Sequence, residues 1–279
     1  MSLSILILTL NEEINLPACL KSVQWCDDIV VFDSFSTDRT VEIARTAGAR
    51  VVQRPFDNYG NQREAARVEV RYKYPWVLAI DADEIPDIAL INEIRTIAEM
   101  PATPCAAYRM RRKDFFVGKW IKHSTLYPSW FIRFYKPDCI RYEPRSVHEY
   151  PTVSGKVGEL QGHLMHHSFN KGISDWMRKH VRYAELEALE SLQHARSGQI
   201  DWKGMFAIQD PVRNRRTLKA ISYRLPLRPT LRFLYMYLFR LGMLDGRAGF
   251  KYCRLLAIYE YMIVLRIMEL QRGDNGLSI

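Results

Sequence analysis

Short, mainly apolar runs alternate with polar stretches of good helix formers through the first hundred residues. The apolar runs are residues 3–8, 28–32, 49–53 and 76–80. Runs of this length and character are typical of strands buried on both faces of a parallel sheet. The intervening stretches, residues 13–23, 38–47 and 61–72, have helical composition. Strands that alternate with helices predict βαβ units in an open, doubly wound α/β sheet.

The pattern changes after Pro101. Strands are predicted at residues 106–110 and 130–135, interleaved with aromatic and basic side chains, and residues 175–193 predict an amphipathic helix. From residue 203 to residue 254 there are 12 Lys and Arg against two acids. We therefore expect two domains, 1–170 and 171–279, the second helical, basic and aromatic.

Composition and charge narrow the class of protein. With 48% hydrophobic and 25% charged residues, the chain can build a full core. Residues 1–100 hold 10 basic and 16 acidic residues (−6), and residues 101–279 hold 30 and 15 (+15), which gives the net +9. The basic half predicts an anionic partner. Five cysteines without a C-x-x-C pair favour a reducing compartment over a disulfide framework.

The apolar segments do not resemble a leader peptide or a membrane span. No basic region precedes the first apolar run, so we expect no signal peptide. Charged residues interrupt the C-terminal segment, so we expect no transmembrane helix there. The segment fits an interfacial helix on an anionic membrane surface. It also fits buried helix packing around Gly242 and Gly246.

Polar residues follow three of the predicted strands. "TLNEE" follows the first strand, "DSFSTD" the second and "DADE" the fourth. The carboxyl ends of parallel strands lie at the edge where α/β sheets bind ligands. The G-x-G-x-x-G and P-loop motifs are both absent from these turns, so a common dinucleotide or P-loop site is not predicted.

The "DADE" turn places three carboxylates within four residues. Asp81 and Asp83 could both reach one Mn²⁺ or Mg²⁺, ions that prefer oxygen ligands and share substrate phosphates. We expect this cation to provide the compensating positive charge. An EF-hand is disfavoured because Pro86 stands where the loop needs glycine. A surface turn without a ligand is the simpler alternative, and we expect Glu84 in a turn or helix start.

Six ordered motifs resemble glycosyltransferase family 2, and within it the bacterial subfamily of lipopolysaccharide core β-1,4-glucosyltransferases. They are "TLNEEINLPACLKSV", "DSFSTDRTVEIA", "LAIDADE", "GKWIKHSTLYPSWFIRFYK", "VHE" and "GMLDGRAGF". The resemblance implies a GT-A fold and an inverting hexosyltransferase (EC 2.4 class). It also implies a UDP-sugar donor.

The resemblance assigns roles in binding the nucleotide sugar. The nucleoside is expected to contact Thr9, Asn11, Glu13 and Asp33, with Asp33 facing uracil. Asn61 and Arg63 are expected near the base or diphosphate, and Asp81 on the ribose or behind the metal ligands. Helix capping is the structural alternative for Asn11 and Glu13.

Catalytic and metal roles follow from the same resemblance. Inverting transfer needs a general base on the attacking side and a cation on the leaving side. Glu149 in "VHE" is the expected base, with Asp114 in reserve. Asp83 is the expected metal ligand, and His166 in "HLMHHS" is a further candidate, with a structural role as its alternative.

The matching central block supplies candidates for acceptor or diphosphate binding. They are Trp120, Lys122, His123, Trp130 and Arg133. Aromatic faces suit sugar rings and basic groups suit phosphates, although aromatic residues also build cores. The processive motif Q-x-x-R-W is absent, which favours one sugar added per encounter.

The resemblance, together with the basic and aromatic C-terminal segment, implies transfer of one hexose, glucose or a related sugar, onto a lipid-linked saccharide in bacterial envelope polysaccharide or lipopolysaccharide synthesis. The expected location is the cytoplasmic face of the inner membrane, peripheral or monotopic. One alternative is a nucleotide-sugar-binding protein without turnover. Nucleic-acid binding is the other, and the acidic strand-end edge opposes it because it would repel a phosphate backbone.

Overall fold

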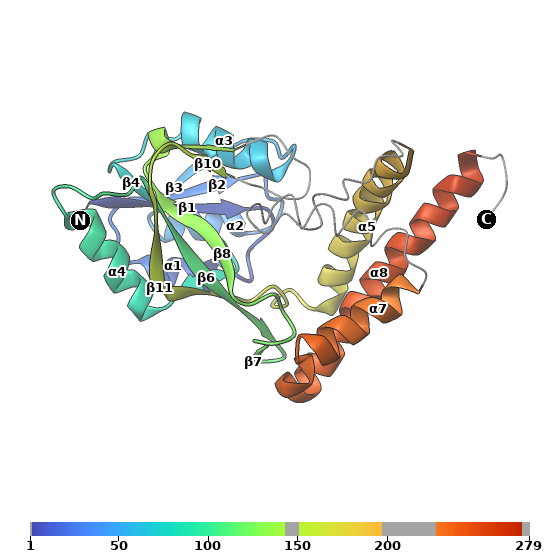
Figure 1. The fold of residues 1–279 in the computed structure, drawn as a ribbon. Coiled ribbons are helices and arrows are strands. Elements are labelled where there is room, and N and C mark those ends of the chain that lie inside the picture. Colours follow the sequence, from blue (N-terminus) through green and yellow to red (C-terminus); the bar gives the residue numbers. More distant parts are fainter. Residues whose placement is uncertain (1, 143–150, 197–226, 275–279) are drawn as a thin grey trace. The chain divides into compact units, whose positions relative to one another are not determined.

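The computed structural model describes residues 2–142, 151–196 and 227–274. The chain divides into two compact units (Figure 1). The first comprises Met1–Lys122 and Leu126–Gly172, and the second comprises His123–Thr125 and Ile173–Ile279.

The first unit is a mixed α/β structure. Its helices are α1 (Leu16–Val23), α2 (Thr40–Thr46), α3 (Tyr59–Glu69), α4 (Ile88–Glu99) and the 3₁₀ turn η1 (Pro137–Cys139). Its strands are β1 (Leu3–Thr9), β2 (Ile29–Asp33), β3 (Arg50–Gln53), β4 (Trp76–Asp81), β5 (Glu84–Pro86), β6 (Ala107–Phe116), β7 (Lys119–Trp120), β8 (Ser129–Tyr135), β9 (Ile140–Tyr142), β10 (Pro151–Val153) and β11 (Val157–His166).

One nine-stranded sheet organises this unit, in the order β3-β2-β1-β4-β8-β6-β11-β5, with β7 beside β6. The first four strands are parallel, and β8 joins β4 antiparallel. Thr9 pairs with Asp33, and Leu8 pairs with Asp81. The prediction that three polar strand ends share one edge is therefore confirmed.

Alternation along β1 explains why its run is apolar on both faces. Ile5 and Ile7 belong to the core cluster that includes Leu16 of α1 and Leu90 of α4. Leu6 belongs to the opposite cluster, with residues of α3. Successive strand side chains point to opposite faces, so a strand covered by helices on both sides needs apolar residues at every position.

The helix boundaries differ from the predicted ones at their N-termini. The helix expected from residue 13 begins at Leu16, because residues 11–13 are bonded across to the loop after β2. The helix expected from residue 61 begins at Tyr59, because the Asn58 side chain accepts the backbone N–H of Asn61 and caps it.

The second unit is helical. It contains α5 (Ile173–Arg196), α7 (Arg228–Leu234), the π-helical turn η3 (Tyr235–Phe239), the 3₁₀ turn η4 (Gly242–Asp245) and α8 (Gly246–Asp274). α5 and α8 bury a small apolar cluster between them, and α7 also packs against α8. None of the helices in the described ranges has the length and apolar character needed to cross a membrane.

Close helix packing is confirmed at Gly242 and is tighter still at Gly249, which the sequence reading missed. A Cβ on Gly249 would lie 2.2 Å from the Gly242 carbonyl oxygen and 2.6 Å from Ser124 Oγ. Gly246 instead adopts a positive φ of 64° at the turn into α8. Both features explain glycine at these positions, because a side chain would clash or strain the backbone.

Candidate functional site

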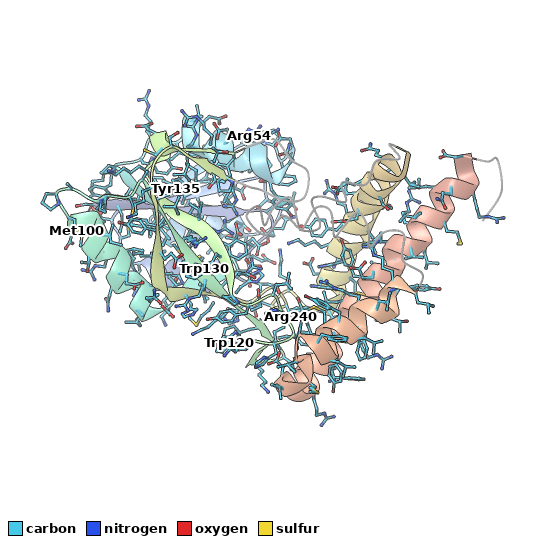
Figure 2. All side chains as sticks on the ribbon, in the orientation of Figure 1. Arg54, Met100, Trp120, Trp130, Tyr135 and Arg240 are labelled. Carbon is cyan, nitrogen blue, oxygen red and sulfur yellow. The ribbon has the colours of Figure 1, made fainter. Side chains whose placement is uncertain are left out.

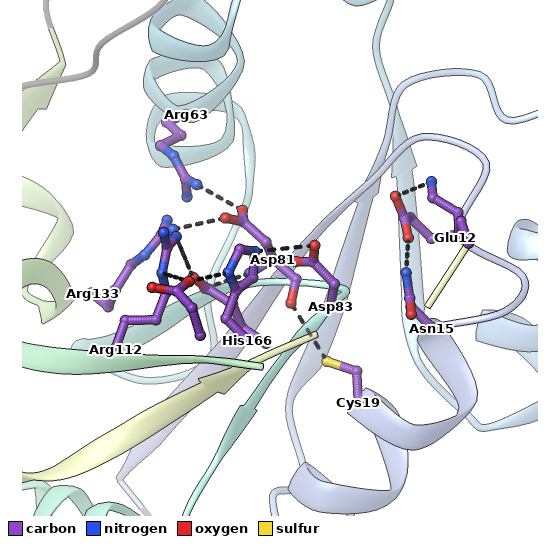
Figure 3. A network of polar contacts seen from close by, with 12 residues as sticks. Glu12, Asn15, Cys19, Arg63, Asp81, Asp83, Arg112, Arg133 and His166 are labelled. Atoms are coloured by element: carbon purple, nitrogen blue, oxygen red, sulfur yellow. Dashed lines mark hydrogen bonds and ion pairs between the residues drawn. The ribbon is translucent and has the colours of Figure 1, made fainter. Parts of the chain in front are cut away.

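The turn after β4 carries the acidic residues of a polar network, seen from close by in Figure 3. Asp81 is the last residue of β4, and Glu84 is the first residue of β5. The turn between them lies beside the ends of β1 and β2, because β1 is hydrogen-bonded to both β2 and β4. This is the edge at which open α/β sheets bind ligands.

Two arginines from distant elements hold Asp81. Arg63 Nη2 of α3 lies 2.7 Å from Oδ1, and Arg133 Nη2 of β8 lies 2.7 Å from Oδ2 (Figure 3). Desolvation opposes ionisation here, but the charges of Arg133 and Arg63 outweigh it and hold the pKa of Asp81 well below its usual range. Asp81 is therefore a paired carboxylate at neutral pH.

A β-bulge aims Arg133 at the acidic turn. Tyr108 pairs with Phe134 and Arg109 with Ile132, so the register skips Arg133. An extra residue of this kind breaks the regular alternation of side chains and can redirect one of them. Arg133 is 7% exposed, and its guanidinium reaches both Asp81 and Glu84.

Glu84 corrects one expectation. We expected it in a turn or helix start, but it begins β5 and is fully buried. Its Oε2 accepts the Asp81 backbone N–H at 3.1 Å, and its Oε1 lies 3.3 Å from Arg133 and 3.6 Å from Arg112. A buried carboxylate needs such partners because removal from water is costly. Glu84 therefore holds the turn in place from its buried side.

Asp83 faces a histidine. His166 Nε2 lies 3.3 Å from Asp83 Oδ2, and His166 Nδ1 lies 2.6 Å from Asp114 Oδ1. Burial and Arg112 disfavour the imidazolium, but Asp83 and Asp114 outweigh them and raise the pKa of His166 to about 9. The two expected metal ligands, Asp83 and His166, therefore lie side by side, and their role in binding a metal stays a prediction.

Asp114, the reserve base, is engaged on two sides. Besides His166, its Oδ1 lies 3.1 Å from Arg112 Nε. Burial tends to raise the pKa of Asp114, yet the bond from His166 and the charge of Arg112 lower it. Glu149, the first choice, lies outside the described residues.

The donor set at Asp83 is compatible with a divalent cation. It offers one carboxylate and one imidazole, ligand types that suit Mn²⁺, and leaves further positions for phosphate oxygens and water. Within the described part of the chain, no three His, Cys, Asp or Glu side chains are grouped as a ready metal site. Two protein ligands are consistent with a cation that is shared with its substrate.

The nucleoside candidates tie the first two strand ends together. Asp33 is fully buried, and its carboxylate accepts hydrogen bonds from Thr9 Oγ1 (2.9 Å), the Ser36 backbone N–H (2.9 Å) and Gln53 Nε2 (3.0 Å). In this conformation Asp33 orders the loop. Its contact with uracil stays a prediction.

Asn11 and Glu13 also bond across to the loop after β2. Asn11 Oδ1 accepts the Thr37 backbone N–H at 2.8 Å, and Glu13 Oε2 accepts the Arg39 backbone N–H at 3.1 Å. Neither residue caps α1, whose N-cap is Asn15. They therefore shape the strand-end loops, and their ligand contacts stay predictions.

Asn61 and Arg63 both belong to α3, but their side chains contact different partners. Asn61 Nδ2 donates to Asp57 at 2.9 Å, at the exposed start of the helix. Arg63 is buried against Asp81. Only Arg63 joins the network around the "DADE" turn.

The five acceptor candidates do not form one cluster. Arg133 belongs to the network at Asp81. Trp120 and Trp130 are labelled at separate places in Figure 2. Trp130 lies against Arg109 and Arg111, whereas Trp120 packs edge-on against Tyr127, with Lys113 and Lys122 over its ring. His123 belongs to the second unit.

Sequence reasoning missed Arg112 and Lys171. Arg112 precedes Asp114 by two positions on β6, so it faces the same side of the sheet. The two-residue spacing along this strand could therefore have indicated that Arg112 lies near Asp114. Lys171 Nζ lies 2.6 Å from Glu12 Oε1 and 3.0 Å from the Asn11 carbonyl oxygen. Nothing local in the sequence indicates this contact.

Comparison with known proteins decides the family. The model described as "Glycosyl transferase family 2" matches residues 4–153, more than half of the 279 residues. The chain belongs to glycosyltransferase family 2. The predicted enzyme class, glycosyltransferase, is thereby confirmed. The predicted α/β sheet with helices on both faces is confirmed by the fold of the first unit.

Two curated glycosyltransferases are similar to this chain in sequence. The lipopolysaccharide core biosynthesis glycosyltransferase LpsC of Rhizobium meliloti (strain 1021) is 26% identical over 276 residues, covering 96% of this chain and 92% of that protein. The uncharacterized glycosyltransferase RT0209 of Rickettsia typhi is 41% identical over 96 residues, covering 34% of this chain and 32% of that protein.

A solved structure is similar over the whole chain at low identity. Crystalline S. aureus TarS 1–349 in complex with UDP-GlcNAc has a TM-score of 0.49 and 14% identity, and the match covers 100% of this chain and 93% of that one.

Proposed function

We propose that this family 2 enzyme transfers a single hexose, glucose or a related sugar, from a UDP-sugar to a lipid-linked saccharide with inversion at the anomeric carbon. The observation that carries the proposal is the pairing of Asp83 with His166 at the edge where β1, β2 and β4 end. That pair provides two ligands for a cation beside Asp81, whose carboxylate is paired with Arg63 and Arg133.

The reaction is a single displacement. The acceptor oxygen attacks the anomeric carbon as its proton passes to a carboxylate base, the bond from that carbon to the diphosphate breaks, and UDP departs. A cation would stabilise the negative charge that develops on the leaving diphosphate. Asp83 and His166 would hold it, while the arginines at Asp81 fix the position of the turn.

Glu149 is the proposed base. Asp114 is less suited, because it is already hydrogen-bonded to His166 and ion-paired with Arg112, and its pKa is lowered. A good base has a pKa near the working pH and an open lone pair.

The proposed setting is the cytoplasmic face of the inner membrane in bacterial envelope synthesis. The name of the LpsC relative supports a lipopolysaccharide core acceptor. The surplus of basic residues after residue 100 supports an anionic surface nearby.

Paired substitutions test the catalytic roles. Asp83→Ala is expected to lower UDP-sugar turnover by at least about a thousandfold and to abolish Mn²⁺-dependent UDP binding. Glu149→Gln is expected to lower turnover similarly while UDP binding persists. Asp114→Asn serves as the matched variant for the reserve base. Binding is measured by calorimetry with and without Mn²⁺, across a panel of UDP-sugars.

Retention of full metal-dependent transfer by Asp83→Ala would overturn the proposed role of Asp83. Loss of turnover in Asp114→Asn with normal turnover in Glu149→Gln would move the base to Asp114. UDP binding without any transfer or hydrolysis across the panel would favour a binding protein.

A further inference from the structure

The turn between α7 and α8 exposes a concentrated group of large apolar side chains. Within residues 238–244, here called the apex, five such side chains are exposed. They are Leu238 (46%), Phe239 (79%), Leu241 (43%), Met243 (46%) and Leu244 (59%). Single exposed apolar residues are common on soluble proteins, but a contiguous group marks an interaction surface.

The shape of the apex is fixed by other residues. Asp245 is 3% exposed and accepts the backbone N–H groups of His123 (2.9 Å) and Ser124 (2.7 Å) and the Ser124 hydroxyl (2.7 Å). Gly242 is buried, and a Cβ there would lie 2.7 Å from the Met236 carbonyl oxygen. The apex is therefore a preformed structure, and its large apolar side chains are not needed to close it.

The exposed charged side chains near the apex are all basic. Between residues 227 and 259 there are six basic residues and one acid, and that acid is the buried Asp245. Arg247, Lys251 and Arg254 are exposed on the first turns of α8, and Arg240 lies within the apex (Figure 2). Arg228 is paired with Glu260 and is turned to the interior.

We propose that the apex inserts into the headgroup region of an anionic lipid bilayer. Apolar side chains would enter the boundary of the acyl chains while the neighbouring basic groups contact lipid phosphates, the arrangement by which peripheral proteins bind membranes. The absence of exposed acid among residues 227–259, which the structure describes throughout, favours this partner over a protein surface of mixed charge. The proposal rests on the proposed function, since it specifies the surface that brings the enzyme to a lipid-linked acceptor.

Vesicle binding tests the apex directly. The full chain is co-sedimented with vesicles of phosphatidylethanolamine and phosphatidylglycerol, and with vesicles of phosphatidylcholine alone. The double variant Phe239→Ser with Leu244→Ser is expected to bind the anionic vesicles at least about tenfold more weakly. A matched control, Ile88→Ser with Leu265→Ser, removes exposed apolar side chains elsewhere, at 73% and 41% exposure, and is expected to bind as wild type.

The charge contribution is measured separately. Arg247→Gln with Lys251→Gln is expected to weaken binding to anionic vesicles several-fold and to reduce its sensitivity to salt. Circular dichroism checks that each variant folds. UDP binding is measured on the same samples, so that a failure of donor binding with intact vesicle binding counts against the proposed function and not against the apex.

Three outcomes would overturn the assignment. They are wild-type binding by the apex variant, equal loss in the Ile88 and Leu265 control, and no binding of wild type to anionic vesicles. If the apex variant instead abolishes self-association at micromolar concentration without affecting vesicles, the surface joins two copies of the chain.

Discussion

The two units differ in whether their unfavourable side chains have partners: Asp81 and Glu84 of the first unit are paired with arginines, whereas large apolar side chains of the second unit are exposed to water. Around the "DADE" turn, acids are matched by arginines: Asp81 by Arg63 and Arg133, and Glu84 by Arg133 and Arg112. At the apex, by contrast, apolar side chains are left in water beside basic groups. The acids of the first region have their ion-pair partners within the same unit. The apolar side chains of the second region are not covered by any described part of their own unit.

This difference separates residues that stabilise the fold from residues that are available to bind a partner. Removing a member of a matched buried set leaves its partners charged and desolvated, which costs stability. Removing an exposed apolar side chain costs little stability, because folding did not bury it. Four substitutions, ordered by expected size, test how far the comparison holds.

The largest effect is expected at Arg133. Arg133→Met leaves one oxygen of Asp81 without its guanidinium and leaves Glu84 with Arg112 alone, at 3.6 Å, so the free energy of unfolding of the first unit should fall by about 3 kcal/mol. Arg109→Met is the control, because the Arg109–Glu159 pair is nearly half exposed on both sides and is worth about 0–1 kcal/mol. Urea unfolding measures both. Equal losses would contradict the matched-network interpretation.

The next largest effect is expected at Gly249 in the second unit. Gly249→Ala places a Cβ 2.2 Å from the Gly242 carbonyl oxygen, so the turn η4 must shift away from α8, at a cost of about 2 kcal/mol. Gly273→Ala on the same helix meets nothing within 4 Å and should be neutral or slightly stabilising. Thermal unfolding compares them. An unchanged transition for Gly249→Ala would show that the turn is not rigid.

A smaller, pH-dependent effect is expected at His180 on α5. Its ring stacks on Trp176 at 3.6 Å, and burial followed by the charge of Lys179 lowers its pKa to about 4. Because the unfolded chain takes up the proton first, this contribution is complete above about pH 6.5 and is lost as pH falls towards 4, by about 1–2 kcal/mol after allowance for solvent screening.

His180→Phe keeps an aromatic stack and removes the titration. The variant should therefore show a shallower fall in stability between pH 6.5 and 4, measured as unfolding midpoints at several pH values. A parallel fall in both proteins would mean that other groups dominate this window.

The smallest effect is expected for an exposed pair. Arg39 Nη2 lies 3.1 Å from Glu42 Oε1, with side chains 70% and 62% exposed. Arg39→Gln should leave the midpoint of urea unfolding essentially unchanged, because water and salt screen a pair this exposed. A loss near that of Arg133→Met would remove the distinction between matched buried charges and surface charges.

Much of the first unit followed from local pattern. The runs at residues 3–8 and 76–80 predicted the central strands β1 and β4, because burial on both faces requires apolar residues at successive positions. The rule for parallel strand ends then placed "TLNEE", "DSFSTD" and "DADE" at one edge. The ordered motifs indicated the family, which the match to residues 4–153 confirms.

Tertiary structure decided how the acids are compensated. The sequence reading expected a cation to supply the positive charge at the "DADE" turn. The fold shows that Arg63, Arg112 and Arg133 supply part of it, from α3, β6 and β8. Their convergence depends on the strand order and on the bulge at Arg133, and no local pattern encodes either.

The sequence by itself therefore determined the central strands, the polar residues gathered at their ends and the family, since these depend on residue type and spacing along the chain. Only the tertiary structure decided that Glu84 is buried, that Arg133 faces Asp81, and that the apex leaves its apolar side chains exposed. The physical reason is the same in each case. Burial and ion pairing depend on which distant elements pack together, and that information is distributed over the whole chain.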